Sequence, residues 1–108
     1  MRQSILATLL ILYAATPLMA TEVPTVELGQ KLFESTLIGS NGNSCSGCHP
    51  DGKGLEEIDA YDDGMLKEMT NFCIRDALKG EMMDLESTEI ESFLLYLRKL
   101  HRSMQPKQ

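Results

Sequence analysis

Apolar residues recur at helical spacing in three segments of this 108-residue chain. The first segment begins at Thr25, and its apolar or small positions are Val26, Gly29, Leu32, Phe33 and Leu37. Spacings of three and four residues place such positions on one face of a helix. Thr25 belongs to a residue type that caps helix N-termini, and Gly39 to one that ends helices. The pattern predicts a helix between these two residues.

A second helix is predicted from Asp62 or Asp63 to Lys79. Acidic side chains at its start and a basic side chain in its last turn both complement the helix dipole. Gly80 follows directly and can adopt the left-handed conformation that ends a helix. The segment therefore carries signals for both of its ends.

A third helix is predicted over residues 88–101. Thr88 and Glu91 have the spacing of a capping box. One face of this helix is apolar and consists of Ile90, Phe93, Leu94, Leu97 and Leu100. Arg98 and His101 lie towards its C-terminal end, where the simplest interpretation is a favourable interaction with the helix dipole.

The first two helices are separated by residues 40–61, which are rich in Asn, Gly, Ser, Pro and Asp. This composition predicts a loop that includes a short helical turn. Because no segment shows the pattern of a strand, we predict an all-α fold with three main helices. The net charge of −6 opposes binding to nucleic acid, which requires clustered basic residues.

The N-terminus has the layout of a secretory signal. A positive start is followed by an apolar run and then by a small residue at Ala20. We predict that residues 1–20 are a signal peptide and that residues 21–108 form one exported domain, which places the mature protein in the periplasm without membrane insertion. The alternative is an uncleaved N-terminal membrane anchor, because Leu18 stands at position −3 relative to the predicted cleavage site, where a small residue such as Ala is usual.

The chain contains three cysteines, and two of them belong to the sequence Cys45-Ser46-Gly47-Cys48-His49. This C-x-x-C-H pattern is the attachment site of c-type haem. Two thiols one helical turn apart can join the two vinyl groups of the porphyrin, and the next residue offers an imidazole to the iron. The alternatives are a thioredoxin-like redox pair and a zinc site. The first lacks a neighbouring βαβ pattern, and the second lacks further ligands.

The chain resembles the small c-type cytochromes over nearly all of residues 21–108. Residues 29–33 are similar to their N-terminal helix, residues 45–49 to their haem site and residues 94–97 to their C-terminal helix. The resemblance implies a small cytochrome c fold, with three main helices wrapped around one covalently attached haem. It also implies that Gly29 and Phe33 cross against Tyr96.

The haem-site motif does not identify the sixth ligand of the iron. Small cytochromes usually supply a Met followed by Pro, and this chain has no such pair. Met82 and Met83 lie only a few residues before the third helix, where the loop is short. Met69 and Cys73 are four residues apart on the second helix and share a face. A thiolate ligand would stabilise ferric iron, whereas a thioether would favour ferrous iron.

A second resemblance concerns the C-terminal third of the chain. Residues 71–80, with Ser87 and the helix around Tyr96 beyond, are similar to a segment of thiosulfate dehydrogenase and SoxA-type cytochromes. In those proteins a Cys in this context ligates a haem iron. The resemblance implies that Cys73 is the distal ligand, while Met83, Met82 and Met69 stay as alternatives.

These features favour a one-electron carrier that acts between exported redox partners, because an iron with protein ligands on both sides cannot bind a substrate. The alternatives are an enzyme or haem subunit of thiosulfate oxidation and, less favoured, a haem protein that binds a small gas. The carrier interpretation predicts no catalytic residue.

Acidic residues dominate the segment that follows the motif. Against the single Lys53 stand Asp51, Glu56, Glu57, Asp59, Asp62 and Asp63. The simpler interpretation is a solvated loop. The functional interpretation is a docking surface that steers a basic redox partner towards the haem edge.

Overall fold

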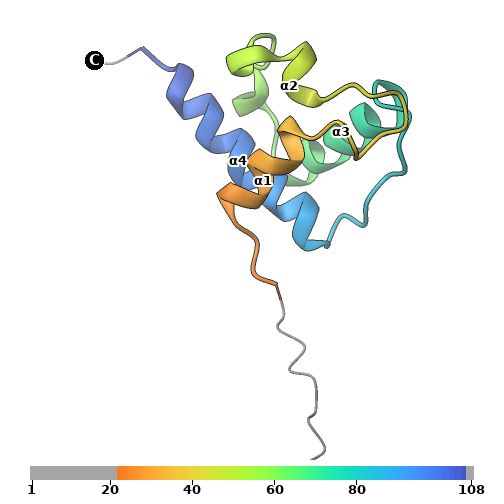
Figure 1. Cartoon of the computed structure of the whole chain (residues 1–108). Helices are drawn as coiled ribbons and strands as arrows, with labels where there is room; N and C mark the ends of the chain where they lie inside the picture. Colours follow the sequence, from red (N-terminus) through yellow and green to blue (C-terminus); the bar gives the residue numbers. More distant parts are fainter. Residues whose placement is uncertain (1–21, 107–108) are drawn as a thin grey trace, which may run out of the picture.

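The computed structural model describes residues 22–106, and Figure 1 shows their arrangement. Within this part every regular element is helical, so the predicted all-α class is confirmed. The α-helices are α1 (Val26–Glu34), α2 (Cys45–Cys48), α3 (Asp63–Asp76) and α4 (Thr88–Met104), and the 3-10 turns are η1 (Pro50–Gly52) and η2 (Ile58–Ala60). The predicted signal peptide lies outside the described residues. Among the residues described, no helix has the length and hydropathy needed to cross a membrane.

Helices α1 and α4 cross in direct contact (Figure 1). The rings of Phe33 and Tyr96 are 5.3 Å apart between centroids and tilted by 59°. A Cβ atom at Gly29 would overlap the backbone of Ser92 and the Cβ of Tyr96, so only glycine allows the two helices to approach this closely. The contact that the resemblance implies for Gly29, Phe33 and Tyr96 is therefore present.

We expect Gly29→Ala to lower the free energy of unfolding by about 3 kcal/mol, because the added methyl must push two helix backbones apart. Gly64→Ala is the matched control. Gly64 is also helical, but a Cβ there would make ordinary contact, 3.5 Å from the Asp62 side chain. Urea unfolding followed by circular dichroism measures both variants, and equal stability of the two would contradict this explanation of the crossing.

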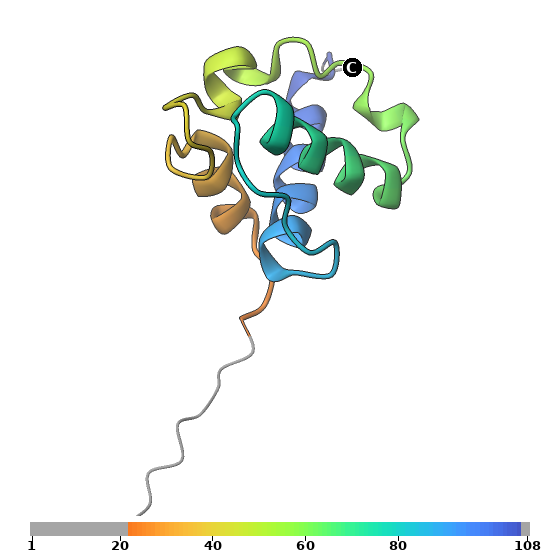
Figure 2. The same ribbon diagram turned by 90° about the vertical axis from the view of Figure 1, so that its right-hand side faces the viewer.

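Helix α3 crosses α4 in a second direction (Figure 2). The buried core lies among the three longer helices and joins Phe33 of α1, Leu66 and Ile74 of α3, and four residues of α4: Ile90, Phe93, Leu94 and Leu97. Ile58 from η2 also belongs to it. The residues around the cysteine motif are thus held between a helix crossing on one side and α3 on the other.

The structure corrects the predicted C-terminal ends of the first two helices. Helix α1 ends at Glu34 rather than near Gly39. Helix α3 ends at Asp76, and the left-handed residue after it is Lys79, with φ 57°, rather than Gly80. Gly80 serves close packing instead, because a Cβ there would meet the carbonyl oxygen of Ile38 at 2.5 Å.

The N-terminal caps were predicted more closely. Thr25 caps α1 as expected and accepts a hydrogen bond from the backbone N–H of Leu28. The capping box at Thr88 is wrong, since Ser87 caps α4 and accepts from the N–H of Ile90 at 3.2 Å. The Thr88 hydroxyl instead donates to the carbonyl oxygen of Glu22 at 3.0 Å. The carboxylate of Glu91 pairs with Lys67 of α3.

The basic residues of α4 do more than complement the helix dipole. Arg98 donates to the carbonyl oxygens of Ile58 at 3.1 Å and Tyr61 at 2.7 Å. The ring Nε2 of the buried His101 lies 3.1 Å from the carbonyl oxygen of Glu56. Both side chains therefore tie the segment that follows the cysteine motif to α4.

Candidate functional site

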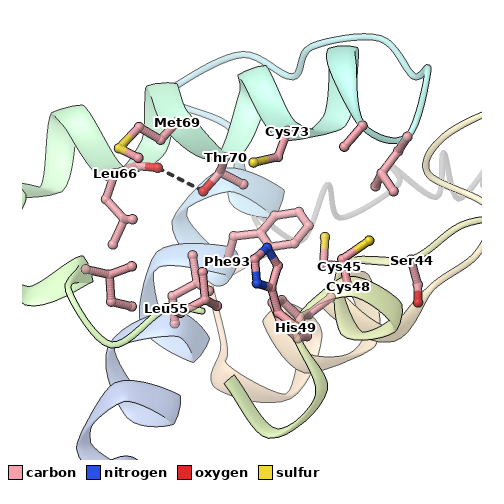
Figure 3. A pocket seen from close by; sticks show the side chains of 15 residues that line it. Ser44, Cys45, Cys48, His49, Leu55, Leu66, Met69, Thr70, Cys73 and Phe93 are labelled. Carbon is pink, nitrogen blue, oxygen red and sulfur yellow. Dashed lines mark hydrogen bonds between the residues drawn. The ribbon is translucent and has the colours of Figure 1, made fainter. Parts of the chain in front are cut away.

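An open cavity lies between α2 and α3, with the core of α4 behind it (Figure 3). It holds about 680 Å³ of space between its lining atoms, including the solvent at its mouth. Its lining is largely apolar, with Phe33, Leu66, Phe93 and Leu97 contributing from three helices. The few polar groups are concentrated at the two facing walls.

Helix α2 forms the wall that carries the motif. Ser44 caps this single turn and accepts a hydrogen bond from the N–H of Gly47 at 3.0 Å, and the N–H of His49 donates to the carbonyl oxygen of Cys45 at 2.9 Å. Because Cys45 and Cys48 are one turn apart, both line the cavity, and Figure 3 shows their sulfur atoms directed to the same side. The two thiols are therefore presented together to whatever occupies the cavity.

The ring of His49 enters the same cavity (Figure 3). Its Nδ1 lies 2.9 Å from the carbonyl oxygen of Lys53. Because a carbonyl oxygen only accepts, Nδ1 is the atom that donates, and in the neutral ring Nε2 keeps a free lone pair. The contact between His49 and the Lys53 carbonyl favours glycine at position 54. Gly54 has φ 90°, and a Cβ atom there would crowd His49 Nδ1 at 3.2 Å. This arrangement is typical of a metal-binding histidine oriented by its second nitrogen.

Burial raises the pKa of two of the cysteine thiols that line the cavity, Cys45 and Cys73. It raises the pKa of the Cys45 thiol to about 11, with a further contribution from Cys73. The pKa of Cys73 is also raised, first by burial and then by the charge of Asp76 and by Cys48. Catalytic redox pairs instead have a thiol with a lowered pKa. The raised pKa of Cys45 thus opposes the thioredoxin-like interpretation of this motif.

Helix α3 forms the opposite wall of the cavity. Of the four residues proposed as distal ligands, two line this cavity and two do not. Met69 and Cys73 both line the cavity, as their spacing of four residues predicts. Met82 and Met83 line a separate surface hollow, together with Phe72. The structure therefore brings two of the four sulfur atoms into the cavity with His49 and leaves the other two outside it.

The side chain of Asn71 explains why Met83 is kept away. Its amide nitrogen donates to the carbonyl oxygen of Met83 at 2.7 Å, and its amide oxygen accepts from the N–H of Met83 at 2.8 Å. Asn71 is itself buried. This pair of bonds fixes the backbone of the loop before α4, and with it the position of Met83.

Sequence reasoning missed Thr70, which lies in the cavity wall beside Met69 and Cys73 (Figure 3). Its hydroxyl donates to the carbonyl oxygen of Leu66 at 2.8 Å. The helical spacing of Leu66, Met69, Thr70, Cys73 and Ala77, all of which line the cavity, is the signal that could have found it.

Most of the acidic residues after the motif have structural partners. Asp62 caps α3 and accepts from the N–H of Met65 at 2.8 Å. Asp63 pairs with Arg98 at 2.9 Å, and Asp59 lies 3.8 Å from the same guanidinium group. These contacts favour a structural role for much of the segment over a purely solvated loop.

Comparison with protein-family models, curated proteins and solved structures gave no match. Within residues 22–106, no group of three or more His, Cys, Asp and Glu side chains is arranged to hold a metal ion. The chemistry of the cavity therefore carries the functional inference: two thiols and an imidazole on one wall, two further sulfur atoms on the other, and apolar side chains between them.

Proposed function

We propose that this chain is a monohaem c-type cytochrome of the periplasm that carries single electrons between redox partners. The observation that supports it most is the meeting of Cys45, Cys48 and His49 at the wall of one apolar cavity. These residues fit a porphyrin chemically, because the lining is apolar and the imidazole has a free Nε2. When bound, haem c would supply an iron that changes between the ferric and ferrous states.

Each residue of the site has a distinct role in this proposal. Cys45 and Cys48 would hold the porphyrin through thioether bonds, in which each S–H would add across one vinyl group without an oxidant. His49 would bind the iron from the α2 wall, and the Lys53 carbonyl oxygen, which accepts from Nδ1, keeps Nε2 free for that role. The apolar side chains would limit the access of water to the iron and so limit side reactions.

We assign the distal position to Cys73, with Met69 as the alternative. Both side chains belong to the wall opposite His49. Met82 and Met83 have less support, because they line a different hollow and the backbone of Met83 is bound by Asn71. A Cys73 thiolate would lower the reduction potential, and Met69 would raise it.

The partners of this carrier are proposed to be exported redox proteins with basic docking surfaces. The net charge of −6 supports this choice, as do the exposed carboxylates of Asp51 and Glu57 beside the motif. Long-range attraction of this kind is screened by salt.

The function is tested with the protein purified from a host that attaches c-type haem. A carrier should titrate reversibly as a one-electron couple, should not change its ferrous absorption spectrum under CO, and should not consume thiosulfate. Both protein ligands prevent access to the iron, which is the reason for the last two results. Thiosulfate turnover would instead support an enzyme of reduced-sulfur oxidation, and rapid CO binding would support a gas-binding protein.

A further inference from the structure

One peptide group connects the ring of His49 to a carboxylate. The carbonyl oxygen of Lys53 and the N–H of Gly54 belong to the same peptide unit. The carbonyl oxygen lies 2.9 Å from His49 Nδ1, and the N–H donates to Glu56 Oε1 at 3.1 Å. The three groups therefore form a continuous chain of two hydrogen bonds, from the carboxylate through the peptide to the imidazole.

We propose that Glu56 is a positioning residue that tunes the donor strength of His49 through the peptide between Lys53 and Gly54. The peptide is conjugated, so an anionic acceptor at its N–H moves electron density onto its carbonyl oxygen. That oxygen then accepts more strongly from Nδ1, and the imidazole becomes a better donor at Nε2. A better donor stabilises ferric iron. This inference rests on the proposed function.

The surrounding structure holds this chain of bonds in place. The carbonyl oxygen of Glu56 is bound by the buried ring of His101 at 3.1 Å, which ties the segment to α4. Gly54 has φ 90°, and its position against His49 leaves little room for a side chain. The pKa of Glu56 is lowered, chiefly by the N–H of Gly54, so the carboxylate is ionised at neutral pH.

The variant that tests the proposal is Glu56→Gln, because the amide oxygen of Gln can keep the hydrogen bond but lacks the charge. Glu57→Gln is the matched control, because Glu57 is the next residue in the chain, its side chain is exposed, and the substitution removes the same charge. In the holoprotein, Glu56→Gln should move the ferric-to-ferrous equilibrium about threefold towards the ferrous form, the size of effect typical of an exposed charge. Glu57→Gln should change it clearly less.

A second measurement distinguishes an effect carried by the two hydrogen bonds between Glu56 and His49 from a direct electrostatic effect of the Glu56 charge on the iron. In the diamagnetic ferrous holoprotein, the proton resonance of His49 Nδ1–H should move upfield in Glu56→Gln, because its hydrogen bond weakens, and should stay in place in Glu57→Gln. Equal shifts of the equilibrium in both variants, or an unchanged Nδ1–H resonance, would overturn the proposal. A chain that binds no haem would instead overturn the proposed function itself.

Discussion

The double variant Cys45→Ser, Cys48→Ser is expected to be exported as a protein that carries no covalently bound haem. A serine hydroxyl does not form the thioether, although it is close to the thiol in shape. The apolar cavity would then lose the group that fills it, and because its lining would lose those packing contacts, the free energy of unfolding should fall by roughly 3 kcal/mol or more. Absorption after acid denaturation measures attachment, and urea unfolding measures stability.

Ser46→Ala is the control for this variant, because Ser46 lies in the same turn and its hydroxyl is 3.1 Å from that of Ser44. It should keep full attachment. If the double variant retained haem through denaturation, the proposed roles of Cys45 and Cys48 would be wrong.

The second large effect is expected for Cys73→Ala. Loss of an anionic thiolate should change the ferric absorption and electron paramagnetic resonance spectra and should favour ferrous iron by at least about 100-fold, since even groups behind the ligands alter metal binding roughly 10- to 100-fold. Spectra of the ferric protein and a redox titration provide the measurement.

Two methionine variants complete this experiment. Met83→Leu should leave the spectra unchanged, because Met83 lies outside the cavity. Met69→Leu should also leave them unchanged if Cys73 is the ligand. An unaltered spectrum in Cys73→Ala together with an altered one in Met69→Leu would identify the Met69 thioether as the iron ligand instead.

Local signals were sufficient for the helical class, for the Thr25 cap and for the motif, because each depends on residues close together in the sequence. Local signals were insufficient to choose between two adjacent residues that have similar chemistry. Ser87 and Thr88 can both cap a helix, and the outcome follows the bond between the Thr88 hydroxyl and Glu22, which is 66 residues away. Similarly, Gly80 was predicted to end α3 by its conformation, but its role is set by contact with Ile38.

The candidate site was predictable on the α2 side and only partly on the α3 side. The order of Cys45, Cys48 and His49 is fixed within one turn, so their shared wall follows from the sequence. The division of the methionines does not, because it depends on the buried Asn71 side chain binding the backbone of Met83. The bonds from Arg98 and His101 to the loop span 40 and 45 residues and have no local signature.

The most direct test of a covalent haem at Cys45 and Cys48 is the mass of the exported chain under denaturing conditions, after production in a host that attaches c-type haem. We predict a coloured protein whose mass is that of residues 21–108 plus one haem, with the added mass located by proteolysis on the peptide that contains both cysteines. A colourless protein with the mass of the polypeptide alone would contradict the proposal.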